Sequence, residues 1–204
     1  AQTRVHDITT SEASVTLRYA PGESFVNSKQ RRVPVSLDAP IFTLTHAMGF
    51  KGVLGGEYNF NRTEASIWKR FWLPASWGKI DCSVKAGAEW NVVPFPLLIL
   101  PEANLSYITQ RETFCLINNM EFLNDRFASM SISYDMNGKL FNRIPLLKNL
   151  KWREMFRIRA LWGTLTDKNN PFKSSNPDLF RFPTRDGKFT SFVMDPNCLL
   201  YTSD

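Results

Sequence analysis

Apolar and polar residues alternate along one short stretch, Lys79–Trp90, and this pattern constrains the fold more than any other feature of the chain. One parity holds apolar or small residues, the other mostly polar or charged ones: Ile80, Cys82, Val84, Ala86, Ala88 and Trp90 against Asp81, Ser83, Lys85, Gly87 and Glu89. Successive side chains on a strand point to opposite faces, so the stretch predicts a strand with one apolar face and one polar face. Its length and terminal Trp match a strand that crosses a bilayer in a β-barrel. A sheet that rests on a soluble core shows the same alternation, so the rest of the chain has to decide between them.

The same alternation predicts further strands, to a total of about eight or nine: Glu12–Ala20, Pro40–Met48, Val53–Asn61, Glu64–Leu73, Phe114–Phe122, Phe127–Met136, Trp152–Thr164 and one that begins at Phe189–Met194. Asn61-Arg62-Thr63 is predicted to be a turn between two of these strands. The pattern after Pro145 predicts one short helix in a turn, Pro145–Leu150. Asn91–Thr113 contains several prolines, which exclude a central strand, and is predicted to pack as a plug or rim.

The distribution of charge and of tryptophan favours the membrane interpretation. Arg153, Arg157 and Arg159 share one face of a predicted strand and need a wet surface, because burying unpaired charges is prohibitive. Together with Lys85 and Glu89 they are predicted to line a lumen. Tryptophans near strand ends suit the interfaces of a membrane, and the predicted interface residues are Trp72, Trp90, Trp152 and Trp162. Lys69, on an apolar face, is predicted to lie near the rim, where its ammonium can reach water.

These patterns predict an all-β fold, an antiparallel transmembrane β-barrel that is incomplete in this chain. Residues 1–197 are predicted to form the partial outer-membrane barrel. Residues 198–204 fit no barrel-closing strand and are predicted to be a non-native tail. Because the sequence starts with Ala1 and without a secretion signal, we expect it to be an internal piece of a longer protein.

The composition narrows the classes of function. The 204 residues are 43% hydrophobic and 22% charged, which excludes a disordered chain, and no apolar run is long enough for a membrane helix. The formal charge of +6 is dispersed over strands and turns, so no nucleic-acid partner is predicted.

Residues that could carry chemistry are few. The three cysteines are far apart and form no Cys-x-x-Cys, and only two histidines occur, so neither a metal site nor a cofactor is predicted. The glycines at 49–56 fit no phosphate-binding motif. A hydrolase would need Ser or Asp motifs near His6 or His46, and none is present. We therefore predict no catalytic residue and no enzyme, and a structural role for His46.

Several motifs resemble one family of membrane proteins. The most specific is G-K-L-F-N-R-I-P-L-L-K-N-L-K-W-R-E at 138–154, preceded by N-N-M-E-F-L-N-D-R-F-A-S at 118–129. G-G-E-Y-N-F-N at 55–61, K-R-F-W-L at 69–73, V-P-F-P-L-L-I-L-P at 93–101 and L-T-D-K-N-N-P at 165–171 add to it. Together they resemble outer-membrane barrels of the surface-antigen and assembly-factor superfamily, in the branch where a carboxypeptidase-regulatory-like domain precedes the barrel.

The resemblance implies a closed antiparallel barrel in the outer membrane of a diderm bacterium, of which this chain lacks the N-terminal part and the last strands. It places the loop 166–188 outside and the Pro145–Leu150 helix in the periplasm. The V-R-G-[FY] motif of the superfamily's assembly factors does not occur in this sequence. The resemblance therefore does not extend to the residues of a protein-insertion or secretion activity.

The leading expectation is a non-enzymatic outer-membrane barrel that acts in envelope assembly, transport or surface attachment. Its partners would be outer-membrane lipid and other envelope proteins. One alternative is a soluble β-sheet module that binds a lipid or glycan through an aromatic-rich surface. Another is a TonB-type nutrient receptor barrel.

Overall fold

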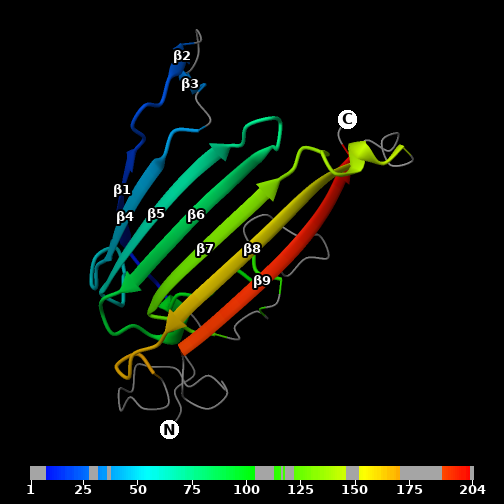
Figure 1. Cartoon of the computed structure of the whole chain (residues 1–204). Coiled ribbons are helices and arrows are strands. Elements are labelled where there is room, and N and C mark those ends of the chain that lie inside the picture. Colours follow the sequence, from blue (N-terminus) through cyan, green and yellow to red (C-terminus); the bar gives the residue numbers. More distant parts are fainter. Residues whose placement is uncertain are drawn as a thin grey trace.

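The chain folds into one large antiparallel sheet and one small hairpin (Figure 1). The computed structural model describes residues 8–27, 32–35, 38–103, 113–115, 117, 122–145, 152–170 and 190–202. The seven-stranded sheet has the order β1-β4-β5-β6-β7-β8-β9. Its strands are β1 (Glu12–Tyr19), β4 (Ile41–Gly49), β5 (Phe60–Trp72), β6 (Lys79–Glu89), β7 (Arg126–Asp135), β8 (Trp152–Thr164) and β9 (Thr190–Thr202). Between β1 and β4 the chain forms the hairpin of β2 (Phe25–Asn27) and β3 (Arg32–Pro34).

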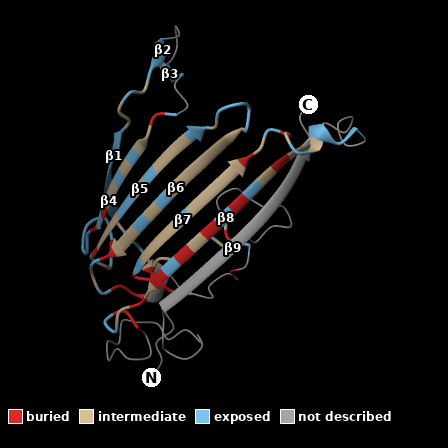
Figure 2. Cartoon of the chain, in the orientation of Figure 1, coloured by how far each residue is buried: buried red, intermediate tan, exposed pale blue. Residues whose placement is uncertain are grey.

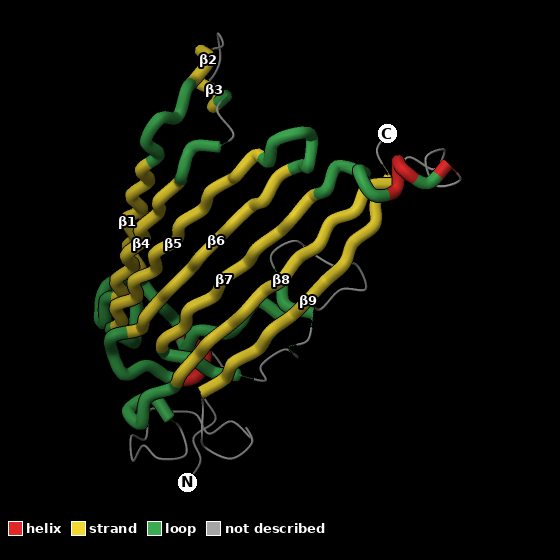
Figure 3. Tube along the Cα trace, in the orientation of Figure 1, coloured by secondary structure: helices red, strands yellow, loops and turns green. Residues whose placement is uncertain are grey.

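Strands make up nearly all the regular structure of the described residues, as Figure 3 shows. Two single-turn 3₁₀ helices, η1 (Phe95–Leu97) and η2 (Phe141–Arg143), lie in the connections. Among the described residues, no helix has the length and apolar character that a membrane span requires.

The register keeps the two faces of the sheet chemically distinct across several strands. Ile67 pairs with Val84, and Val84 pairs with Met130, so apolar residues stand side by side on one face. One position along, Ser66 pairs with Lys85 and Lys85 pairs with Ser129 on the other. A slip of one residue would exchange the faces, so the alternation of the sequence specifies this register. We call the apolar side the outer face and the polar side the inner face.

The outer face is the exposed one. Val84 is 43% exposed and Ile158 50%, whereas Arg157 and Arg159 on the inner face are 4% and 2% exposed. Figure 2 shows buried residues interspersed with exposed ones along β8. Other large apolar side chains of the outer face are also exposed, among them Val15, Leu17, Tyr19, Phe42, Leu44, Ile67, Met130, Phe156 and Trp162. The usual arrangement of a soluble sheet, with apolar side chains inside and charged ones outside, is reversed here.

The small hydrophobic core lies over the inner face, at the end of the sheet where β6 ends and β7 begins. We call this the loop end, and the opposite end the turn end. One buried cluster gathers residues from β5, from the β6–β7 connection and from the segment after β8: Phe60, Val93, Leu98, Leu123 and Leu165. A second consists of Phe114, Ile117 and Leu161. The connection after β6 therefore packs on the polar face and not on the apolar one.

The prediction of an all-β antiparallel fold is confirmed, whereas the described sheet is open. β1 and β9 form its two edges and do not pair with each other. The strands predicted at Glu12–Ala20, Pro40–Met48, Phe127–Met136 and Trp152–Thr164 are found with bounds that differ by at most one residue.

Four details of the sequence analysis are corrected or left undecided. The predicted turn at Asn61-Arg62-Thr63 is wrong, since β5 runs through these residues and no strand covers 53–59. The predicted strand Phe114–Phe122 is wrong for its described part, where Phe114 forms one isolated bridge with Ala103 and Ile117 packs in the core. Residues 198–202 continue β9 and pair with β8, and the prediction that residues 198–204 are a non-native tail stays a prediction. The helix predicted at Pro145–Leu150 stays a prediction, because residues 146–150 lie outside the described residues.

Candidate functional site

A polar groove runs over the inner face, between the sheet and the connection that covers part of it. Its volume is about 840 Å³. Small hydroxyl side chains of the middle strands form much of its floor: Thr43, Thr45, Ser66, Ser83, Ser129, Ser131 and Ser133. Ile99–Glu102 and Phe114 of the connection line the side opposite the sheet. The groove is large enough for a small organic molecule or for a file of water molecules.

Two ion pairs join neighbouring strands in the wall of the groove. Arg70 donates two hydrogen bonds to Asp81, at 2.6 and 3.0 Å, in a bidentate arrangement. The Lys79 ammonium lies 3.7 Å from an Asp135 oxygen. The guanidinium of Arg70 also lies over the rings of Trp68 and Trp72, on the same face of β5. A planar guanidinium suits both contacts, which fixes Arg70 in the wall of the groove.

The predicted lumen residues all belong to the inner face, but their surroundings differ. Lys85 points to the cover and pairs with Glu102 at 3.6 Å. Arg157 and Arg159 lie deep in the groove, paired in register with Ser133 and Ser131 of β7. Arg159 donates to the backbone carbonyl of Thr113, and Arg157 lies 3.5 Å from the Met155 sulfur.

Arg153 and Glu89 lie at opposite ends of the inner face. Arg153 is only half-buried and is near the turn end. Glu89 is fully buried at the loop end, where it serves as an anchor for the chain rather than as a residue that lines the groove.

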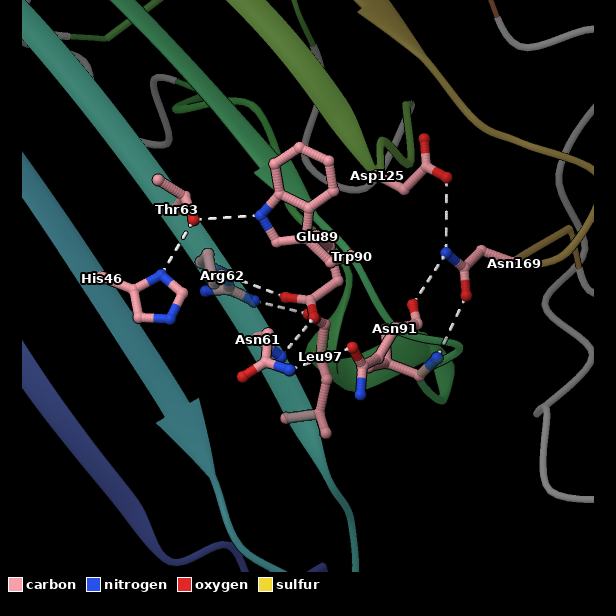
Figure 4. Close-up of polar contacts among 11 residues, drawn as sticks. His46, Asn61, Arg62, Thr63, Glu89, Trp90, Asn91, Leu97, Asp125 and Asn169 are labelled. Carbon is pink, nitrogen blue, oxygen red and sulfur yellow. Dashed lines mark hydrogen bonds and ion pairs between the residues drawn. The ribbon is translucent and has the colours of Figure 1, made fainter.

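Glu89 is the centre of a hydrogen-bonded network at the loop end, which we call the latch (Figure 4). Its carboxylate accepts from the backbone N–H of Asn61 at 3.1 Å and from Arg62 at 3.4 Å. Arg62 donates in turn to the carbonyl of Leu97 at 2.5 Å, and Asn61 donates to the Asn91 side chain at 3.2 Å. These contacts hold the start of the β6–β7 connection against β5.

A second branch of the latch joins the segment after β8. Asn169 accepts from the backbone N–H of Val93 at 3.0 Å and donates to the carbonyl of Asn91 at 3.2 Å and to Asp125 at 3.3 Å. Asp125 also accepts from the backbone N–H and the hydroxyl of Thr166. The two connections at the loop end therefore share one buried polar anchor (Figure 4).

The predicted interface tryptophans take different positions. Trp90 and Trp162 are exposed on the outer side, and the Trp90 indole N–H donates to the Thr63 hydroxyl at 3.0 Å. Trp72 is exposed as well, but it ends β5 on the inner parity, beside Arg70. Trp152 begins β8, and its side chain lies outside the described residues.

Two other predictions concern the outer face. His46 contacts the Thr63 hydroxyl at 2.9 Å, so Thr63 is a partner of both His46 and Trp90 (Figure 4). Lys69 directs its ammonium to the ring of Phe71, at 5.3 Å from the centroid, and so toward the turn end of the sheet.

Sequence reasoning missed the residues that join separate segments. Arg62, Asp125 and Asn169 bond partners that lie between 27 and 78 positions away, and no local pattern marks such pairs. The Arg70–Asp81 pair, in contrast, can be predicted from the sequence. The two residues lie symmetrically about the turn at 73–78, so a hairpin centred there brings them opposite each other.

Among the described residues, no group of three or more His, Cys, Asp or Glu side chains is arranged to hold a metal ion. Fold and site together define an all-β domain: an open antiparallel sheet with an exposed apolar face and a covered, charged inner groove. The model of the C-terminal domain of a family of unknown function, DUF5686, matches residues 2–173, and the chain belongs to this family. No curated protein and no solved structure matches the chain.

Proposed function

We propose that this domain is part of the wall of a non-enzymatic β-barrel in the outer membrane of a diderm bacterium, with a role in envelope assembly, transport or surface attachment. The observation that carries the proposal is the reversal of the two faces. Exposed valine, leucine, isoleucine and phenylalanine side chains cover the outer face, and two arginines lie buried on the inner one. The resemblance in the sequence to surface-antigen barrels supports the same assignment.

The physical argument starts from the size of the apolar surface. A soluble monomer rarely exposes an apolar patch of more than a few hundred Å², and the outer face carries exposed apolar side chains on six strands of the large sheet, β1, β4, β5, β6, β7 and β8. Each such side chain gains roughly 1.5–3 kcal/mol when it is fully transferred from water to an apolar environment. Lipid chains provide that environment without any further protein layer.

The length of the strands fits a bilayer. β6 has 11 residues, which at roughly 3.3 Å each span about 36 Å along the strand. A tilt of about 40° leaves a height of about 28 Å, close to the apolar band of roughly 25 Å in outer-membrane barrels. β5 and β8, with 13 residues each, are longer than β6, whereas β1 and β4 have eight and nine residues, so it is the middle strands of the sheet that match the band.

Polar groups on the outer face lie near its two limits. At the loop end, His46, Thr63 and Trp90 form a hydrogen-bonded group. At the turn end, Lys69 lies beside Phe71, and Trp77 stacks under the Lys139 ammonium at 4.1 Å. Amphipathic aromatic and lysine side chains favour the two interfaces of a membrane, so these groups mark the edges of the proposed apolar band.

The direct test measures where lipid touches the sheet. The three native cysteines are replaced, one new cysteine is placed at Val84 or at Ser83, and each is labelled with a fluorophore after reconstitution into vesicles. These two neighbours on β6 point to opposite faces, so each controls for the other. We expect lipids with a brominated or spin-labelled chain to quench the label at Val84 strongly and the label at Ser83 weakly.

Equal, weak quenching at both positions would contradict the proposal. If the same protein were also a water-soluble monomer without detergent, a soluble module that binds a lipid or glycan would be the better description. A label at Ser83 that is quenched more than the label at Val84 would reverse the assignment of the faces.

A further inference from the structure

One arginine stands on the apolar outer face at the loop end. Arg126 is the first residue of β7 and shares the outer parity with Ala128 and Met130. Its side chain is exposed, in contrast to the buried arginines of the inner face. A charge in this position needs a polar or charged partner outside the sheet, because its neighbours along the strand are apolar.

The charges of the sheet are sorted between its two faces. On the strands from β1 to β7, all the acidic residues have the inner parity: Glu12, Glu64, Asp81, Glu89 and Asp135. The outer parity of these described strands holds two permanently charged cations, Lys69 and Arg126, and no carboxylate. Glu154 of β8 has the outer parity but is buried near the turn end. The outer face around Arg126 is therefore positive, without a carboxylate of the sheet to balance it.

The two cations of the outer face have different surroundings. The Lys69 ammonium lies over the ring of Phe71. Arg126 forms no ion pair with any residue that the structure describes. A guanidinium is planar, stays charged and offers five N–H donors, which match pairs of phosphate oxygens. Arg126 is thus the better site of the two for an external anion.

The register places a second donor beside Arg126. Thr164 of β8 pairs directly with Arg126 on one side, and Ala88 of β6 pairs with it on the other. Residues directly opposite each other on one face have Cβ atoms about 5 Å apart, so the Thr164 hydroxyl and the guanidinium can contact the same ligand. The methyl group of Ala88 is too small to cover the guanidinium.

The depth of Arg126 suits the headgroup region of a membrane. Ile132, six residues further along β7, pairs with Ile158 in the middle of β8. Six residues span about 20 Å, or about 15 Å of depth at a tilt of about 40°. Half of an apolar band of roughly 25 Å is about 12 Å, so Arg126 lies just outside the hydrocarbon. Trp162, the exposed diagonal neighbour of Arg126, has an amphipathic ring that favours the same level.

We propose, on the basis of the membrane function proposed above, that Arg126 and Thr164 bind the phosphate of an anionic lipid in the leaflet at the loop end. The guanidinium donates to two phosphate oxygens, and the hydroxyl donates to one. The acyl chains lie along β7, over Ala128 and Met130. A free phosphate ion gains only the polar contacts, whereas a lipid also gains the apolar ones, so a lipid headgroup is the ligand that fits both parts of the surface.

Lipid-selective quenching in the whole chain tests the proposal. The native cysteines are replaced, and one new cysteine at Ala128, two residues from Arg126, carries a fluorophore. The vesicles are phosphatidylcholine with a minority of one lipid that has brominated chains, either anionic phosphatidylglycerol or phosphatidylcholine. The ratio of the two quenching constants measures the preference for the anionic lipid, because the depth and the accessibility of the label are the same in both.

A label at Leu17 is the matched control. Leu17 and Ala128 lie in one row of the register, which runs through Leu44, Ala65 and Ala86. Four strand spacings, about 19 Å, separate them, so the control label is out of reach of Arg126. We expect a ratio of about two to five at Ala128, the range for one exposed charge pair, and a ratio near one at Leu17.

Substitutions assign the preference to its residues. Arg126→Gln should lower the ratio at Ala128 to about one, and Arg126→Lys should keep part of it, because lysine keeps the charge but not the planar fork. Thr164→Val should lower the ratio by a smaller factor. Lys69→Gln, which removes the other cation of the outer face, should leave it unchanged.

Three results would overturn the proposal: a ratio near one at Ala128, an equally raised ratio at Leu17, or a raised ratio that survives Arg126→Gln. The failure of this proposal is distinguishable from the failure of the membrane function. Quenching at Val84 by brominated phosphatidylcholine reports lipid contact whether or not the anionic lipid is preferred. If neither lipid quenches Val84 or Ala128, both proposals are wrong.

Discussion

The strongest quantitative prediction concerns a charge placed in the middle of the outer face, by Ile158→Arg. Ile158 is the seventh of the 13 residues of β8, six positions from either end. Six residues span about 20 Å, or about 15 Å of depth at a tilt of about 40°, so the side chain lies near the midplane. Arg at the midplane of a membrane barrel costs about 2–4 kcal/mol, and the cost falls to about 0–1 near the interfaces.

Phe71→Arg is the matched control, since Phe71 is the residue before the end of β5 and lies beside Lys69. Both side chains are exposed on the outer face. We expect Ile158→Arg to lower the folding equilibrium constant in vesicles by about 30- to 700-fold, and Phe71→Arg by at most about fivefold. The measurement is urea unfolding of the reconstituted protein, followed by tryptophan fluorescence.

A water-exposed face gives a different pattern. Surface substitutions in water usually change stability by less than about 0.5 kcal/mol, whatever their position along a strand. Equal and small effects of the two substitutions would therefore refute the lipid contact of the outer face. A larger effect of Phe71→Arg than of Ile158→Arg would refute the assignment of depth.

Two further predictions concern the inner face. Gly163→Ala should destabilise the protein by about 1–3 kcal/mol, because a Cβ there would overlap the Asn124 amide. Most of this cost should disappear in an Asn124→Ala background, and an equal loss in both backgrounds, measured by denaturant midpoints, would contradict the steric reason. Arg62→Ala should cost about 3 kcal/mol, since it leaves the buried Glu89 carboxylate without its cation, and should expose the chain near Leu97 to protease. Adding Glu89→Gln should restore part of the stability, and a further loss in the double variant would show that the charge of Glu89 is not the cause.

The sequence was sufficient to predict the middle of the sheet, because each strand there has one mainly apolar parity. The bounds of β6 were predicted to within one residue, and those of β7 and β8 are equally close. These strands pair with neighbours of the same pattern, so local alternation and long-range pairing agree. The parity of the three arginines on β8 followed from the same reasoning.

The errors lie where local pattern and tertiary contact disagree. The polar run Asn61-Arg62-Thr63 resembles a turn, but Arg62 has its partner Glu89 on β6, and Thr63 has His46 and Trp90 beside it. Polar residues at the end of a strand can remain in the strand when such distant partners satisfy them.

Phe114–Phe122 shows the converse error. Its alternation resembles a strand, yet Phe114 and Ile117 pack into a cluster over Leu161 rather than along a sheet. An alternating pattern indicates only that every second side chain is buried. It does not indicate whether these side chains pack within a sheet or against a separate cluster. The latch had no sequence signal, because all its pairs join separate segments.

The position of Asn169 has a mechanical consequence. This one side chain holds Val93, Asn91 and Asp125 at once, and it belongs to a turn whose neighbours, Asp167 and Lys168, are exposed. A pull on that turn has to break three hydrogen bonds or drag Asn91–Val93 with it. A displacement of the turn after β8 is therefore transmitted to Asn91–Val93 through the side-chain amide of Asn169.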